Sequence, residues 1–88
     1  MNHKHRKVLH ALFAHPFNDN IDFGQVQNVL RELGAEIEER HGSKIAVTLN
    51  GKTAAFKHAR HGVPREEVMQ LRHFLTDCGV DPTRDYPL

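Results

Sequence analysis

Basic and histidine side chains gather at two places in the sequence, residues 40–44 and residues 57–61. Both stretches combine guanidinium or ammonium groups with imidazoles. They contain Arg40, His41, Lys44, Lys57, His58, Arg60 and His61. Guanidinium and ammonium groups bind phosphate, and an imidazole can accept or donate a proton near neutral pH. If the fold brings the two stretches together, the sequence predicts a site for an anion such as a phosphate.

The segment between these stretches predicts how they are placed. Apolar and polar residues alternate on both sides of Asn50-Gly51, the dipeptide that most strongly signals a two-residue hairpin turn. Such a turn pairs Leu49 with Lys52 and, further along the hairpin, Lys44 with Lys57. Like charges directly opposite each other destabilise a sheet, and a phosphate bound between them would offset that cost. The sequence therefore predicts two neighbouring lysines at an anion site.

The register of the preceding strand, expected over 35–39, can be predicted in the same way. A three-residue turn over 40–42 would pair Ile37 with Ile45 and place Glu38 across from Lys44. Two interpretations of the lysines then stay open. Either they bind an anion, or Glu38 neutralises Lys44 and the group is a solvated surface cluster, which contributes little to stability.

Helical periodicity flanks these strands on both sides. Apolar residues recur at helical spacing over 8–13, 23–33 and 68–78, and Asp22 and Gln25 have the spacing of a capping box. The strands are expected over 35–39, 44–49 and 52–58. The sequence thus predicts an α+β fold, in which a three-stranded antiparallel meander is covered on one face by two helices and preceded by a short extra helix. The opposite face of the sheet is expected to be open.

The 88 residues are enough for one domain with a modest core. We expect a basic arm and short helix over 1–20, the main domain over 21–80 and an irregular tail over 81–88. The formal net charge is only +1, so attraction to a polyanion must come from the distribution of charge. No apolar run is long enough to span a membrane or resembles an export signal, and the chain is expected to be cytoplasmic.

Metal and cofactor chemistry finds little support in the composition. The single cysteine, Cys78, excludes an internal disulfide and a cysteine-based zinc site. The histidine pairs within 3–5 and 58–61 have no third ligand at a recognisable spacing. We therefore expect no metal site and no cofactor.

Four short stretches, taken in their order and spacing, resemble a known family. They are "VQNVLRELGAEI" at 26–37, "GS" at 42–43, "RH" at 60–61 and "LRHFLTDCGV" at 71–80. Over roughly the span from Asp22 to Val80, the chain is similar to the HicA toxins. These are small ribonucleases of bacterial toxin–antitoxin pairs, with a fold like that of double-stranded-RNA-binding domains.

The resemblance implies an αβββα sandwich, cleavage of messenger RNA and neutralisation by a HicB-type antitoxin protein. It also implies a catalytic histidine directly after the Gly-Ser pair, a position that Lys44 occupies in this chain. A lysine side chain, with a reference pKa of about 10.4, does not accept a proton near neutral pH unless that pKa is strongly lowered. His58 and His41 are therefore the candidate catalytic residues. The candidate RNA-binding residues are Lys44, Lys57, Ser43, Arg40, Arg60 and His61.

Three functions stay open on this sequence. The leading prediction is a divergent endoribonuclease, in which the lysines stabilise charge developing on the phosphate and a histidine moves the proton. The second is a non-catalytic module that holds RNA through its backbone phosphates and 2′-hydroxyls. The third is a protein-interaction domain without an RNA ligand. In any of them, the free edge of the third strand is available to an antitoxin peptide.

Overall fold

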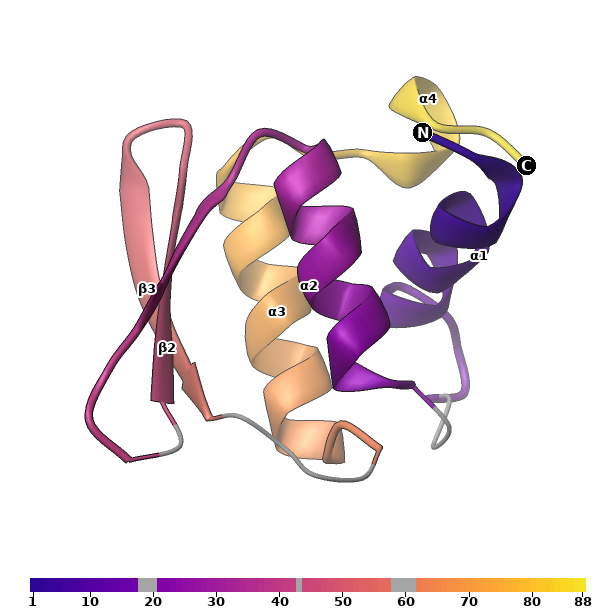
Figure 1. Ribbon diagram of the computed structural model, residues 1–88. Coiled ribbons are helices and arrows are strands. Elements are labelled where there is room, and N and C mark those ends of the chain that lie inside the picture. Colours follow the sequence, from indigo (N-terminus) through magenta and orange to yellow (C-terminus); the bar gives the residue numbers. More distant parts are fainter. Residues whose placement is uncertain (18–20, 43, 58–61) are drawn as a thin grey trace.

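The computed structural model describes residues 1–17, 21–42, 44–57 and 62–88. Its elements, in chain order, are α1 (His3–Leu12), α2 (Phe23–Glu32), β1 (Glu36–Glu39), β2 (Lys44–Leu49), β3 (Lys52–Lys57), α3 (Arg65–Asp77) and α4 (Pro82–Asp85). The three strands form one antiparallel sheet in the order β1-β2-β3. Figure 1 shows three layers: the sheet, then α2 with α3, then α1 with α4. The predicted α+β class and three-stranded antiparallel sheet are confirmed.

The core lies between the sheet and the pair of helices α2 and α3. Both helices present apolar residues three or four positions apart, which places these residues on one face. The side chains of Val26, Val29, Leu30, Val68, Leu71 and Leu75 are completely buried. They pack in one cluster with Ile45, Val47 and Phe56 from the inner face of the sheet. Each such side chain contributes about 1.5–3 kcal/mol through burial, so this packing fixes which face of the sheet stays open.

The N-terminal segment is more ordered than its composition suggested. Helix α1 begins at His3, and the side chain of Asn2 caps it by accepting a hydrogen bond from the His5 backbone N–H at 2.8 Å. Leu9 and Leu12 are fully buried. The predicted short N-terminal helix is therefore present, but it begins at His3 and includes residues expected to form a basic arm, because capping and burial stabilise a helix that charge alone would leave in solvent.

The C-terminal segment also contains a helix where an irregular tail was expected. The carboxylate of Asp81 caps α4 by accepting from the backbone N–H groups of Thr83 and Arg84 at 3.1 and 3.2 Å. Pro82 occupies the first helical position, where its missing N–H costs nothing. The segment is held against α1, since His10 Nε2 donates to the Tyr86 carbonyl at 2.7 Å.

Local signals at the ends of the two main helices had mixed success. Asp22 does precede α2, but its side chain makes no capping hydrogen bond, so the predicted capping box is not formed. Pro64 precedes α3 in an extended conformation, and Gly79 takes a positive φ of 84° after the helix. A left-handed residue after the last turn is the usual way in which such a helix ends.

The second hairpin has the predicted register throughout. Its pairs run from Leu49 with Lys52 to Lys44 with Lys57. The turn residues Asn50 and Gly51 have φ values of 52° and 81°. Positive φ at both central positions is the requirement of a type I′ turn, and Asn-Gly meets it at the lowest cost.

Asn50 also ties this turn to α3, because its side-chain Nδ2 donates to the Cys78 carbonyl at 2.7 Å. We expect Asn50→Ala to lower the free energy of unfolding by about 2 kcal/mol, since it loses this bond and puts alanine at positive φ. The matched variant Asn50→Gly loses the bond but not the conformation, and should lose about 1 kcal/mol. Urea unfolding measures both, and equal values would contradict the conformational part of the argument.

The first hairpin departs from its predicted register by two residues. Ile37 pairs with Val47 and Glu38 with Ala46, while the Arg40 N–H donates to the Lys44 carbonyl at 2.8 Å. The turn therefore lies between Arg40 and Lys44 instead of over 40–42, and the predicted pairs Ile37 with Ile45 and Glu38 with Lys44 are wrong. A shift of two keeps every side chain on its predicted face, because the period of a strand is two.

Cys78 is buried at the end of α3, where its Sγ donates to the Leu49 carbonyl at 3.3 Å. Burial raises the pKa of this thiol; Lys52 lowers it and Asp77 raises it by smaller amounts. The folded state holds the thiol proton more tightly, so stability should fall as the pH rises above the unfolded pKa of about 8.5. We expect iodoacetamide to react at least about tenfold faster with the urea-unfolded chain. Equal rates would contradict this burial.

Candidate functional site

Two lysines lie side by side on the open face of the sheet. Lys44 begins β2, Lys57 ends β3, and the two are directly opposite each other, as predicted. The Lys44 carbonyl accepts from the Arg40 N–H, so its backbone groups face β1 and not β3. Lys44 and Lys57 are therefore a non-hydrogen-bonded pair, the kind whose Cα atoms approach to about 4.5 Å and whose side chains lie closest. Both side chains are exposed.

Glu38, the acidic residue that could have neutralised Lys44, pairs with a different side chain. Glu38 lies opposite Ala46, and its Oε2 forms an ion pair with Arg40 Nη2 at 3.7 Å. Within the described ranges, no ion pair involves either lysine. Glu67 does approach Lys57, but it accepts from the backbone N–H, at 3.4 Å. The interpretation in which Glu38 neutralises Lys44 is therefore wrong.

Small side chains cover the sheet beside the lysines. Ala46, Thr48, Thr53 and Ala55 face the same side as Lys44 and Lys57, since they alternate with the inward residues along β2 and β3. The two threonine hydroxyls, Thr48 Oγ1 and Thr53 Oγ1, are 2.9 Å apart and hydrogen bonded. The result is a surface of small side chains with two positive charges at one end and with Glu36 and Glu38 of β1 beside Thr48 and Ala46. An extended phosphate backbone could lie along β2 and β3.

The other predicted site residues divide into those the structure places and those it does not. Arg40 and His41 are exposed in the turn between β1 and β2, and Figure 1 shows this turn at the same end of the sheet as the end of β3. These two residues therefore adjoin the lysine pair. The remaining four, Ser43, His58, Arg60 and His61, lie outside the described residues.

Three of the histidines elsewhere in the described chain have structural partners. His5 Nδ1 is 2.6 Å from Glu32 Oε1, His10 donates to the C-terminal segment, and His15 Nε2 is 3.4 Å from Arg72 Nη1. Among the residues that the structure describes, no three His, Cys, Asp or Glu side chains come together as metal ligands would. The histidine pair within 58–61 lies outside them.

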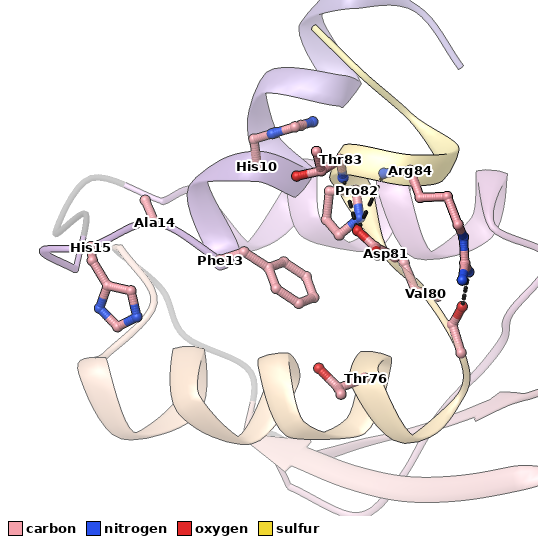
Figure 2. Close-up of a pocket in the computed structure, with 11 residues that line it drawn as sticks. His10, Phe13, Ala14, His15, Thr76, Val80, Asp81, Pro82, Thr83 and Arg84 are labelled. Carbon is pink, nitrogen blue, oxygen red and sulfur yellow. Dashed lines mark hydrogen bonds between the residues drawn. The ribbon is translucent and has the colours of Figure 1, made fainter.

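A cavity that was not predicted from the sequence lies between α1, the end of α3 and α4. It has a volume of about 670 Å³, and the Phe13 ring points into it (Figure 2). Its charged groups already have partners: Arg84 bonds to Asp85 at 2.8 Å and to the Gly79 carbonyl at 3.1 Å, and Asp81 caps α4. With Arg84 and Asp81 already paired, this cavity offers less chemistry than the lysine pair. Residues 81–88 were expected to form an irregular tail, so this cavity was not predicted.

None of the helices in the described part of the chain is both long and apolar enough to cross a membrane. Comparisons of the chain with protein-family models, curated proteins and solved structures found no match.

Proposed function

We propose that the chain is a HicA-like RNA-binding protein that holds the RNA backbone with Lys44 and Lys57. The observation that carries this proposal is the pairing of two exposed lysines with no carboxylate partner among the described residues. A phosphate between two ammonium groups forms charge-assisted hydrogen bonds with both and removes their mutual repulsion. The flat surface of alanines and threonines beside them leaves room for the sugar and the next phosphate.

The arrangement of elements supports the same proposal. The order α2-β1-β2-β3-α3, with both helices on one face of the sheet, fits an αβββα sandwich like that of double-stranded-RNA-binding domains. In this proposal α1 and α4 are additions to the family's fold. A fold of this kind favours RNA as the ligand but does not supply an activity, which must come from the site.

Cleavage of messenger RNA is the second proposal, and the position of His41 favours it. This exposed imidazole lies in the turn that leads directly to Lys44, the position of the family's catalytic residue. His41 or His58 would take the proton of the 2′-hydroxyl as its oxygen attacks phosphorus, while the two lysines stabilise the charge on the phosphorane. The P–O5′ bond would then break, and the 5′-oxygen would leave with a proton from that imidazolium or from water. A HicB-type antitoxin would be the protein partner of such a toxin. Without the proton transfer, the same surface is a non-catalytic RNA-binding module.

RNA binding is tested with a fluorescent structured RNA at salt concentrations from about 50 to 200 mM. The double variant Lys44→Ala/Lys57→Ala should weaken binding at least about tenfold and lower the slope of log affinity against log salt by about 1 to 2, because two phosphate contacts are lost. Lys52→Ala removes one positive charge from the other end of β3 and should change affinity less than about twofold. Wild-type affinity in the double variant would contradict the proposal.

Cleavage is tested by incubating a messenger RNA with the wild type and with His41→Ala, His58→Ala and Lys44→Ala. We expect one histidine variant to lose cleavage while its RNA affinity stays within about twofold of wild type, as a proton-transfer role requires. Binding without cleavage by the wild type would favour the non-catalytic module. Cleavage that survives all three substitutions would contradict the catalytic proposal.

A further inference from the structure

Strand β3 has a free edge with unused backbone groups. The sheet ends at β3, and the two-residue turn makes Leu49 and Lys52 a hydrogen-bonded pair, so alternate residues after Lys52 direct their N–H and C=O groups away from β2. These residues are Thr53, Ala55 and Lys57. The bond from the Lys57 N–H to Glu67 agrees with this alternation. In the described chain, nothing else bonds to the outward backbone of the other two.

A pocket lies directly beside this edge, between β3 and α3. It has a volume of about 410 Å³, within the range of about 300–1,000 Å³ typical of ligand sites. Its apolar wall is formed by Ala54, Phe56 and Phe74, and the two phenylalanine rings pack edge to face at 5.7 Å. Lys52 and Asp77 also line it.

The pocket has the position that the side chains of a fourth strand would need. Ala54 and Phe56 alternate with Thr53 and Ala55, so the pocket lies on the inner side of the strand whose outward backbone groups are free. A strand added to this edge would direct alternate side chains to the open face and to the inner side. Backbone hydrogen bonds would hold it, and an apolar side chain in the pocket would select it.

The charges on the edge indicate which strand fits. β3 carries Lys52 and Lys57 and no acidic residue, while Lys44 lies next to Lys57 on the open face. A second copy bound through the same edge would add further lysines to this surface, and like charges between neighbouring strands are unfavourable. Acidic side chains on the open-face side of an added strand would instead lie near the lysine pair. The charges therefore favour an acidic strand from another protein.

We propose that β3 binds an extended segment of another protein as a fourth strand, whose acidic residues lie on the open face and whose alternate apolar residues face the pocket. This inference stands on the edge and the pocket, and it does not depend on RNA binding. The free edge explains affinity, and the Phe56–Phe74 pocket together with Lys57 explains specificity.

The test uses a short synthetic peptide of alternating glutamate and leucine, with a block arrangement of the same residues and a lysine–leucine peptide as controls. The alternating acidic peptide should bind saturably, and both controls should bind at least about tenfold more weakly. On binding, the amide hydrogens of Thr53 and Ala55 should exchange at least about tenfold more slowly. Equal binding of the lysine–leucine peptide would contradict the charge argument.

Two substitutions separate the edge from the pocket. Ala55→Pro removes an outward N–H without removing a bond to β2, which is where a strand tolerates proline. Ala54→Leu fills the pocket from a half-buried position. Each should weaken binding of the acidic peptide at least about tenfold, whereas Thr48→Val, on β2 and away from both the edge and the pocket, should leave affinity within about twofold.

Unchanged peptide binding in both Ala55→Pro and Ala54→Leu would overturn the proposal. A wild-type dimer in sedimentation that Ala55→Pro dissociates would also overturn it, since a second copy would then occupy the edge. If Ala55→Pro fails to fold, Ala54→Leu and the exchange of the two amides still decide the result. If the lysine pair does not bind RNA, the Lys44→Ala/Lys57→Ala variant will keep wild-type RNA affinity. That result would not change the outcome of the peptide experiments.

Discussion

Lys57→Glu is expected to weaken RNA binding strongly and to raise the free energy of unfolding. In the wild type, two ammonium groups face each other across β2 and β3 with no carboxylate partner in the described chain. A glutamate at 57 would convert this pair into an opposite-charge pair, a change of about 0.5–1 kcal/mol in favour of the folded state. The same carboxylate would repel phosphate, and we expect RNA affinity to fall about a hundredfold at low salt.

The opposite signs of the two effects are what distinguish a binding site from a structural pair. Urea unfolding gives the change in stability, and titration with fluorescent RNA gives the change in affinity. Lys52→Glu is the matched control, since it makes the same charge change in the same strand but opposite Leu49. It should neither stabilise the protein nor reduce RNA affinity by more than about fivefold. Equal losses of affinity in both variants would show that only net charge matters.

The same reasoning predicts how RNA acts on stability. A ligand that binds only the folded state stabilises it by RT ln(1 + [L]/Kd), and the effect should be greatest at low salt, where both the lysine repulsion and the phosphate attraction are least screened. In Lys57→Glu the increase in Tm caused by RNA should disappear. The lysine pair therefore affects both the stability of the free protein and the extent to which RNA stabilises it.

The second hairpin could be predicted from the sequence because its determinants are local. Asn50 and Gly51 fix both the turn type and the register, and the register alone places Lys44 beside Lys57. The central geometric feature of the candidate site therefore follows from a dipeptide and a count of residues. No long-range contact had to be known.

The first hairpin shows where such counting fails. Gly42, with a φ of 73°, can serve a three-residue turn over 40–42 or over 41–43. Both turns keep the same residues on each face, so the alternating pattern cannot choose between them. The choice nevertheless decides whether Glu38 faces Lys44 or Ala46, and therefore whether the lysine is neutralised. Whether Lys44 has an acidic neighbour therefore depends on the register of β1 on β2, which the hydrophobic pattern does not determine.

The start of α1 and the whole of α4 were missed for a different reason. Helices as short as α1 and α4 are marginal in isolation, and tertiary contacts provide most of their stability. Here the contacts join the two ends of the sequence: His10 bonds to the Tyr86 carbonyl and Arg6 Nη1 reaches the Pro87 carbonyl at 3.5 Å. Pairings between such distant residues leave no local signal, so a basic arm and an irregular tail were the simpler expectations.

Arg72→Ala is expected to cause a large loss of stability, although the residue lies outside the candidate site. From α3, its Nε donates to the Leu12 carbonyl at 2.8 Å and its Nη2 to the Ala14 carbonyl at 3.0 Å. Leu12 ends α1, so its carbonyl has no acceptor role within the helix. The guanidinium also lies 4.7 Å from the centre of the Phe17 ring. Alanine would leave two part-buried carbonyls without their donor, at about 2–4 kcal/mol in total.

Arg65→Ala is the matched control, because the Arg65 guanidinium lies over the same Phe17 ring, at 4.8 Å, with no hydrogen bond recorded in the described chain. It should cost only about 0.5–1 kcal/mol, the value of an exposed cation–π contact. The difference between the two variants in urea unfolding isolates the bonds to α1. Equal losses would mean that the aromatic contact, and not the bridge from α3 to the end of α1, holds the first helix against the rest of the fold.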